Sequence, residues 1–455
     1  MRVSIFLIFS AFIPFIISVN ILQLHYPGKS PQSIPFSIAN FGQIPYGRNV
    51  TGEIHISTPM NACLPQSLNS HLQKNTFVLL ALRGNCSFLT KAYIAQASGA
   101  SMLIVVDNVL EMTENIIPMS SNDNEDTSNL TIPTLFIAKN DGDHLMKMSQ
   151  NESINVSANF LLKKSAKVNY TFWLTSSQPE SLSLVASFHE YHKRIDESGD
   201  APTFFKAHYT GLFHCKFCNF TNYTYFPDNC ISGGRYCSAY PDGANSSIAV
   251  NYIYEDLRQL CLYRHELKVW WKYMTKFAKI CLGNPILYEQ CSIAVLNKLE
   301  KKFEIPNLTH KIQTCFNNSF IVPEGEKLDI NRNDNILLKE ERKTSIDRAI
   351  GYWPMVTIND EVYMGSLAGD LVFSAICEAF EEKPRICRVR VDDENSINSD
   401  IIIMVLIMTG FVVACMTIIY CTSHKKRKDA KVRAMEISEI IGKYHVLREE
   451  KNNIA

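Results

Sequence analysis

The sequence predicts an α/β (α+β) ectodomain made of two domains and followed by one transmembrane helix. Three observations carry this prediction. Strand and helix patterns alternate between residues 76 and 138, cysteines accompany helical stretches between residues 215 and 387, and an uncharged apolar run spans Ile401–Tyr420. That run contains twenty residues, which is long enough for a helix to cross the hydrocarbon core of a bilayer.

The residues around the apolar run predict its orientation. The sequence HKKRK at His424–Lys428 follows the run, and positive charge marks the cytosolic side of a membrane segment. Twelve of the fourteen cysteines and all glycosylation sequons precede the run, which fits an oxidising lumen. We therefore expect the C-terminus in the cytosol. The expected glycosylation sites are Asn49, Asn129, Asn151, Asn155, Asn169, Asn219, Asn222, Asn245, Asn307 and Asn317.

These signals divide the chain into six expected segments. They are a signal peptide at 1–18, a first domain at 22–165, a second domain at 166–390, a stalk at 391–400, a transmembrane helix at 401–421 and a cytoplasmic tail at 422–455. Arg2 and the apolar run Val3–Ile17 indicate the signal peptide, and an uncleaved anchor is the alternative. The formal net charge is zero, and a basic tail beside a membrane suits anionic lipid, so no nucleic-acid partner is expected.

The first domain has the pattern of a strand–helix–strand unit. TFVLLAL at Thr76–Leu82 and MLIVVDN at Met102–Asn108 are apolar runs of strand length, and the Ala-rich stretch Lys91–Ala100 between them is helical. Another strand is expected at Ile132–Ala138. It follows the polar stretch Ser120–Thr131, which we expect to be an exposed loop.

The motifs of this domain resemble a protease-associated domain. The segments RGNCSFLTKAYIAQASGASMLIVVDN and IPTLFIAKNDGDHL carry the resemblance. Protease-associated domains are non-catalytic modules of proteases, transmembrane ubiquitin ligases and vacuolar sorting receptors. In the sorting receptors the RGxCxF loop binds a cargo peptide, which implies a cargo-binding role for the matching residues here and a rearranging loop at Ser120–Thr131. The matching residues are Arg83, Gly84, Asn85, Cys86, Ser87 and Phe88.

The residue types in this loop suit peptide binding. Gly84 allows a close approach of another backbone, and Arg83 offers several donors to carbonyl or carboxylate oxygens. Cys63 and Cys86 are the only cysteines of this domain, so we expect them to form a disulfide that holds the loop. The alternative places Arg83 in a surface salt bridge and Phe88 in the core. Asn85 begins the sequon NCS, where a glycan would crowd the site, although cysteine in the middle position makes sequons inefficient.

The second domain begins with the strand pattern VNYTFWL at Val168–Leu174 and is rich in cysteine. Helical patterns follow at Tyr254–Cys281 and Cys291–Phe303, whereas the charged stretch Pro323–Thr344 is expected to be an exposed insertion. The order of the cysteines does not determine their pairing. They are Cys215, Cys218, Cys230, Cys237, Cys261, Cys281, Cys291, Cys315, Cys377 and Cys387.

The resemblance to vacuolar sorting receptors continues through this domain. The segments GGRYCS, LRQLCLYR, VWWKYMTKFAKIC and WPMVTINDEVYMG are similar to the receptors' central region, which is related to thioredoxin. The resemblance therefore implies a disulfide-rich thioredoxin-like domain, with Pro354 cis before a strand and Gly365–Cys377 leading into the last helix.

An enzyme is the main alternative to a binding protein. CKFC at Cys215–Cys218 has the spacing of a redox pair, yet a thioredoxin-type pair follows the first strand, where this chain has TSSQPESL. A four-cysteine zinc site at Cys215, Cys218, Cys230 and Cys237 does not suit an oxidising lumen. No hydrolase, nucleotide-binding or metalloprotease motif is present, so we expect no enzyme activity, metal or cofactor.

The tail contains two expected sorting signals. Tyr444 and Leu447 in YHVL fit a tyrosine-based signal that an extended segment presents to clathrin adaptor complexes, and Glu436 with Ile440 and Ile441 fits an acidic dileucine signal. The alternative is an amphipathic helix that lies on the bilayer. The EGF-like repeats of plant receptors are absent from the expected stalk, which is the largest departure from that family.

The sequence as a whole predicts a single-pass type I receptor of Golgi, endosomal and vacuolar (prevacuolar) membranes. It would bind soluble lumenal proteins, such as vacuolar or lysosomal hydrolases, and recruit adaptors through its tail. Two alternatives remain from other classes, namely a membrane-anchored thiol oxidoreductase or folding factor that uses Cys215 and Cys218, and a scaffold that does not sort.

Overall fold

The computed structural model describes residues 21–28, 30–66, 76–110, 119, 127, 129–214, 228–238, 246–388 and 394–452. The expected signal peptide, most of the loop Ser120–Thr131, and the expected sites at Cys215, Cys218, Asn219, Asn222 and Asn245 lie outside these residues. The chain divides into two compact units, Met1–Arg388 and Val389–Ala455.

An eight-stranded mixed sheet forms the first domain, with strand order β2-β1-β8-β4-β5-β6-β7-β3. Its strands β4, β5, β6 and β7 run parallel. The chain forms β1 Ile21–His25, β2 Gln32–Pro35, β3 Ser37–Ile38, β4 Asn49–Ile56, β5 Phe77–Leu82, α1 Phe88–Ala97, β6 Met102–Val106, β7 Thr134–Ile137, α2 Lys139–Ser149 and β8 Asn155–Asn159.

Burial on both faces explains the continuous apolar runs of the central strands. Every residue of β6 and β7 is buried, as expected for parallel strands that are covered on each side. The parallel arrangement brings the C-terminal ends of β5 and β6 together at one edge of the sheet. Residues 83–88 leave the sheet at that edge, so the fold places the expected cargo loop there.

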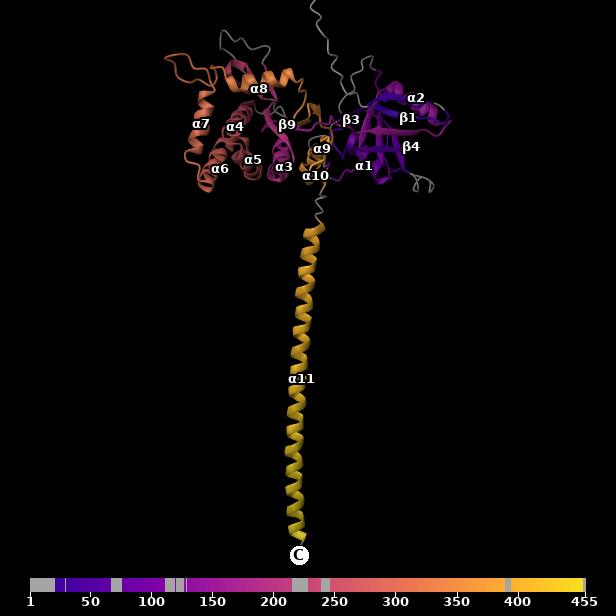
Figure 1. Ribbon diagram of the computed structural model, residues 1–455, viewed down its shortest axis with the longest axis vertical. Coiled ribbons are helices and arrows are strands. Elements are labelled where there is room, and N and C mark those ends of the chain that lie inside the picture. The colour runs from indigo at the N-terminus through magenta and orange to yellow at the C-terminus, as the bar shows by residue number, and fades with distance from the viewer. Residues whose placement is uncertain are drawn as a thin grey trace, which may run out of the picture. The chain divides into compact units, whose positions relative to one another are not determined.

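A four-stranded sheet with order β10-β9-β14-β15 forms the centre of the second domain. Strand β9 runs parallel to β10 and antiparallel to β14. The helices α4, α5, α6 and α7 form a group beside it (Figure 1). The elements are β9 Val168–Leu174, α3 Pro179–Ser198, β10 Thr203–Tyr209, β11 Leu212–Phe213, β12 Cys230–Ile231, η2 Ser232–Gly234, β13 Tyr236–Ser238, α4 Ser246–His265, α5 Leu267–Ile280, η3 Pro285–Leu287, α6 Tyr288–Phe303, α7 Leu308–Asn318, α8 Ile336–Asp347, β14 Met355–Ile358, β15 Glu361–Val362, α9 Gly369–Glu378 and α10 Arg385–Arg388.

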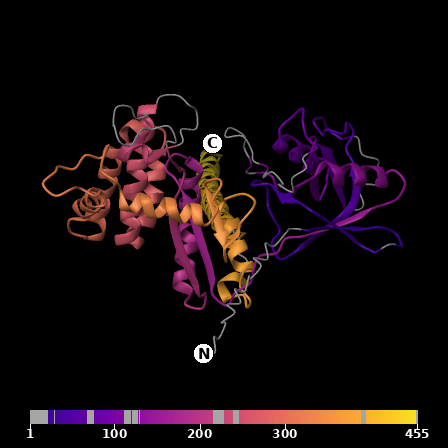
Figure 2. The same cartoon turned by 90° about the horizontal axis from the view of Figure 1, so that it is seen from above.

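Two expectations about this domain were wrong in detail. The single helix expected at Tyr254–Cys281 is divided at Glu266, whose backbone leaves the helical region. The stretch Pro323–Thr344 is not wholly an exposed insertion, because its second half enters α8. There Leu338 is fully buried and Glu341 is only 3% exposed. Figure 2 shows α8, coloured orange, crossing the direction of the pink helices of the same domain.

Five disulfides hold the described part of the first unit. One joins Cys63 to Cys86 in the first domain. Three of the others connect neighbouring helices, since they join α4 to α7, α5 to α6 and α9 to α10. The pairs in the second domain are Cys230–Cys237, Cys261–Cys315, Cys281–Cys291 and Cys377–Cys387. The Cys230–Cys237 disulfide removes two ligands of the four-cysteine zinc alternative, because zinc binds thiolates.

The second unit contains one long helix, α11 Glu394–Asn452. Residues Ile401–Tyr420 lie within this helix. Among the residues that the structure describes, no helix has the length and apolarity that a membrane crossing requires. The transmembrane helix expected at 401–421 stays a prediction.

Candidate functional site

The loop Arg83–Phe88 connects β5 to α1 and has an unusual backbone. Gly84 has φ +109° and the next residue, Asn85, has φ +69°. Glycine adopts positive φ at little cost, and asparagine tolerates it better than most residues. The helix that follows begins at Phe88 because the Ser87 hydroxyl accepts the Thr90 N–H at 3.1 Å and caps it. The loop therefore turns sharply just before α1.

A disulfide joins the loop to the segment that follows β4. The bond lies between Cys63 and Cys86, whose Cα atoms are 5.8 Å apart. That segment is tied to the end of β5, since the Leu82 N–H donates to the Met60 carbonyl at 2.8 Å. The two segments thus form one connected surface at the edge of the sheet.

Lys91 lies beneath this surface and is fully buried. Its Nζ donates to the Gly84 carbonyl at 2.7 Å and also to the Asn61 carbonyl. The same Nζ lies 3.4 Å from the sulfur of Cys63 and 3.5 Å from that of Cys86. Burial lowers the pKa of this ammonium group. Lys91 therefore links both segments and contacts the disulfide that joins them.

Arg83 forms an ion pair at the rim of the loop. Its guanidinium donates to Asp107 Oδ1 at 3.0 Å, and the side chains are 33% and 8% exposed, respectively. The guanidinium also lies 5.8 Å from the ring centre of Phe88 and 5.9 Å from that of Phe136. A third of the Arg83 side chain thus stays open to a partner while its carboxylate and aromatic contacts hold it in place.

The structure brings the sequence-predicted loop residues together as one short surface. Asn85 is exposed, whereas Phe88 is half-buried and packs edge-to-face on Phe136, with ring centres 6.0 Å apart. Sequence reasoning missed Lys91 and Asp107 as members of the site. Lys91 gave no signal in the sequence, because a lysine in an Ala-rich helix is normally exposed to solvent.

A buried polar cluster occupies the place after β9 where a thioredoxin-type cysteine pair would lie. Asp256 on α4 accepts the Ser176 N–H and the Ser176 hydroxyl at 2.6 Å each, and the Thr175 hydroxyl at 3.1 Å. Burial raises the pKa of Asp256 to about 7, against the effect of these donors. All three side chains are buried and the cluster contains no cysteine, so its hydrogen bonds stabilise the turn after β9.

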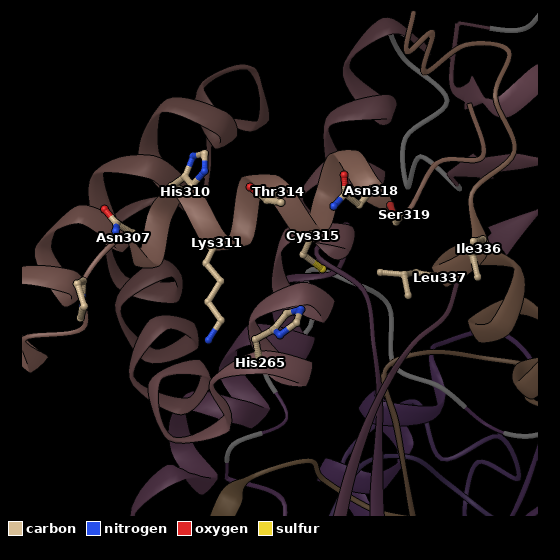
Figure 3. Close-up of a pocket in the computed structure, with 11 residues that line it drawn as sticks. His265, Asn307, His310, Lys311, Thr314, Cys315, Asn318, Ser319, Ile336 and Leu337 are labelled. Atoms are coloured by element: carbon tan, nitrogen blue, oxygen red, sulfur yellow. The ribbon is translucent and has the colours of Figure 1, made fainter. Parts of the chain in front are cut away.

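A surface pocket of about 610 Å³ lies along α7. Figure 3 shows His265, Lys311 and Cys315 on its walls, with Leu337 at one end. Lys311 is already paired with Glu266 at 2.8 Å. The lining residues form no metal site, and no metal-binding cluster occurs among the described residues. This pocket therefore has no chemistry that identifies a ligand.

The expected modification and sorting residues are placed as follows. The described sequon asparagines are all exposed, as glycosylation requires. They are Asn49, Asn129, Asn151, Asn155, Asn169, Asn307 and Asn317. In the tail, Glu436 is exposed on α11, and the same helix continues through the positions of Ile440, Ile441, Tyr444 and Leu447.

Comparisons with known families match both domains. Residues 50–145 match the PA (protease-associated) domain, and residues 168–377 match the vacuolar sorting receptor thioredoxin-like domain. The two matched regions together cover the loop Arg83–Phe88, the sheet of the second domain and the helical group beside it.

Several curated vacuolar sorting receptors are similar to most of this chain. Vacuolar-sorting receptor 7 of Arabidopsis thaliana is 28% identical over 406 residues, which covers 82% of this chain and 61% of the relative. Vacuolar-sorting receptor 1 of Pisum sativum is 27% identical over 405 residues, again covering 82% and 61%. The chain thus spans about three fifths of the length of these relatives. Among solved structures, an aminopeptidase from Aneurinibacillus covers 32% of this chain and 31% of its own at 19% identity and a TM-score of 0.22, which is too low to support an argument.

Proposed function

Because the chain carries a protease-associated domain joined to a vacuolar sorting receptor thioredoxin-like domain, we propose that it is a type I transmembrane cargo receptor. It binds soluble lumenal proteins, chiefly vacuolar or lysosomal hydrolases, and sorts them from the Golgi to an endosomal or vacuolar compartment. The structural observation that carries this proposal is the loop Arg83–Phe88. A disulfide and the Lys91 hydrogen bonds hold its inner side, and Asn85 and part of Arg83 are exposed.

Several features of the loop support noncovalent peptide binding. Its disulfide and the Lys91 hydrogen bonds reduce the conformational freedom that binding would otherwise remove. Asn85 and part of Arg83 are available at the surface. The two groups offer hydrogen-bond donors, so the loop suits a partner that presents carbonyl or carboxylate oxygens.

The test of cargo binding is capture of lumenal proteins by the intact chain in detergent, near pH 7 and near pH 5. The wild type is compared with the double variant Arg83→Ala/Asp107→Asn, because removal of Arg83 alone would leave a buried carboxylate without its partner. We expect soluble hydrolases to bind the wild type near pH 7 and to bind the double variant about tenfold more weakly, which corresponds to a loss of about 1.4 kcal/mol.

Arg348→Ala is the matched control for that experiment. Arg348 forms a 2.7 Å ion pair with Asp360 in the other domain, so its replacement also removes an Arg–Asp pair but leaves the loop unchanged. Capture by this control should equal capture by the wild type. If the double variant retains the same hydrolases as the wild type, the loop is not the cargo site.

Recruitment of clathrin adaptors through Tyr444 and Leu447 is the second part of the proposal. The tail is helical at these positions, so binding to an adaptor in an extended form requires this part of α11 to unwind. We expect Tyr444→Ala/Leu447→Ala to move the receptor from endosomal membranes to the cell surface, whereas Val446→Ala in the same four residues should not. Unchanged localisation of the double variant would favour the scaffold alternative.

The proposed topology has its own measurement. A single-pass protein should resist extraction by alkaline carbonate, and protease added to sealed vesicles should remove only the tail. The apolar run Ile401–Tyr420 and the basic residues after it support this topology. Extraction into the soluble fraction would contradict it.

The described cysteines give no support to an oxidoreductase. Twelve cysteines lie between residues 21 and 388, and the ten that the structure describes are all paired in disulfides. Cys215 and Cys218 lie outside the described residues. The turn after β9 contains Thr175, Ser176 and Ser177, which are buried.

A further inference from the structure

Lys91 is a buried cation without an acidic partner in the described part of the chain. Its ammonium group contacts the carbonyls of Gly84 and Asn61 and the two sulfurs of the disulfide, and none of these groups carries a negative charge. Arg83 differs, because Asp107 already balances its charge. The uncompensated positive charge of the site therefore lies under the loop and not at its rim.

The hydrogen bond from Lys91 determines how the Gly84–Asn85 peptide is turned. In a trans peptide the C=O and the following N–H point in opposite directions. Because the Gly84 carbonyl points inward to Lys91 Nζ, the Asn85 N–H points away from the protein interior. Asn85 is exposed, and its N–H has no acceptor among the described residues.

An apolar side chain of similar length would fill the space around Lys91 without the cost of burying an ammonium group. The ammonium adds two properties that such a side chain lacks. It fixes the Gly84 carbonyl in the inward orientation, and it places a positive charge behind the outward N–H. Both properties favour an acceptor oxygen with negative charge in front of Asn85.

We propose that Lys91 is a positioning residue that turns the Gly84–Asn85 peptide so that the Asn85 N–H donates to a carboxylate oxygen of the bound partner. The inference rests on the proposed function of the loop and adds the chemistry that the loop recognises. Lys91 acts through the peptide and does not itself touch the partner, since it is fully buried.

The sequence allows this N–H to be observed alone. The dipeptide Gly-Asn occurs only at Gly84–Asn85 and Gly283–Asn284. In the intact deuterated chain in detergent micelles, 13C-carbonyl glycine combined with 15N-asparagine therefore gives two signals in a carbonyl-selected amide spectrum. Gly283 also has positive φ, at +104°, so Asn284 is a matched internal control on an exposed turn.

The probe is sodium acetate, titrated against sodium chloride at equal ionic strength. We expect the Asn85 proton to shift downfield and to saturate with acetate, while Asn284 does not respond. The variant Lys91→Met should lose the saturating response, and Lys139→Met, which alters a partly exposed lysine on α2, should keep it. No saturating response in the wild type, or an equal response in Lys91→Met, would overturn the proposal.

A measurement on the wild type alone covers the case in which Lys91→Met does not fold. The chemical shift of the Gly84 carbonyl should change as Lys91 loses its proton. The midpoint of this change should lie below pH 10.5, because burial lowers the pKa of Lys91. The Gly283 carbonyl should not change with it. A Gly84 signal that is constant over this range would contradict the hydrogen bond on which the proposal depends. These outcomes are independent of cargo capture, so failure of the sorting proposal and failure of the Lys91 proposal are distinguishable.

Discussion

At the scale of single residues, the buried carboxyl group of Asp256 has a pKa that folding changes strongly. Its carboxyl is 2% exposed and receives hydrogen bonds from Ser176 and Thr175. Desolvation outweighs these donors and raises its pKa from 3.8 to about 7. The folded state therefore holds a proton on Asp256 at a pH at which the unfolded chain has lost it.

The pH dependence of stability follows from that difference. Between pH 3.8 and about 7 the folded state binds more protons at Asp256, so its contribution to stability is present at low pH and is lost as pH rises through this window. The full effect is roughly 4 kcal/mol, since each pKa unit corresponds to about 1.4 kcal/mol. In urea unfolding at a series of pH values, Asp256→Asn should remove this slope.

Two comparisons make the Asp256 experiment decisive. Asp347→Asn on the exposed side of α8 should leave the slope unchanged. His192 acts with the opposite sign, because burial lowers its pKa to about 4, so its contribution is lost as pH falls from 6.5 toward 4. The Asp256 contribution is therefore taken as the difference between wild type and variant. A difference that does not change with pH would show that folding does not raise the pKa of Asp256.

Secondary-structure elements show which parts of this fold the sequence could predict. Strand β9 has the predicted bounds Val168–Leu174, because its first residues alternate between apolar and polar side chains, as expected for a strand. Helix α1 was predicted three residues late, since its start depends on the Ser87 cap and not on periodicity. The break at Glu266 between α4 and α5 was also not predicted, because the helical spacing of apolar residues continues on both sides of it.

The candidate site was predictable to a similar extent. The motif located Arg83–Phe88, but the role of Lys91 depends on the carbonyl of Asn61, which is distant in sequence. A lysine in an Ala-rich helix is normally on the solvent side, so its burial required the three-dimensional contacts. The ion pair between Arg83 and Asp107 could not be predicted from the sequence either, because Asp107 follows a different strand and is distant from Arg83 in sequence.

Helix α8 contributes a buried leucine to the core of the second domain. Because the sequence of this helix is highly charged, the burial of Leu338 was not predicted. Leu338 is fully buried in a core cluster with Ile231, Ile253 and Phe320. Truncating such a leucine removes buried contacts and leaves a cavity, so Leu338→Ala should lower the free energy of unfolding by about 2–5 kcal/mol. Urea unfolding followed by tryptophan fluorescence measures the change. Lys343→Ala on the same helix is the control, and an equal effect of the two substitutions would mean that α8 is not part of the folded core.

The two domains of the first unit are joined by specific backbone contacts. The Tyr46 hydroxyl donates to the Met364 carbonyl at 3.1 Å and accepts the Met364 N–H at 2.8 Å. The Ser366 N–H donates to the Gly42 carbonyl at 3.0 Å. Tyr46 is 8% exposed, so these bonds are shielded from water. Such contacts favour coupled unfolding of the first domain and the second domain.

Gly365 lies at the centre of this contact and tests the coupling. Its φ is +103°, and a Cβ added there would lie 2.8 Å from Ile44 Cγ1, so Gly365→Ala should strain the contact by roughly 1–3 kcal/mol. All four tryptophans lie in the central domain, at positions 173, 270, 271 and 353, so their fluorescence follows that domain alone. Hydrogen exchange of β5 and β6 follows the other.

In the wild type we expect one urea midpoint by both methods, because the shared contact makes unfolding of one domain expose the other. In Gly365→Ala the two midpoints should separate. Gly351→Ala is the matched control, since a Cβ there meets no atom within 4 Å. Separate midpoints in the wild type would mean that the contact does not couple the domains. The loop Arg83–Phe88 would then depend only on its own domain for stability, because the Tyr46 and Gly365 contacts would transmit no stability to it.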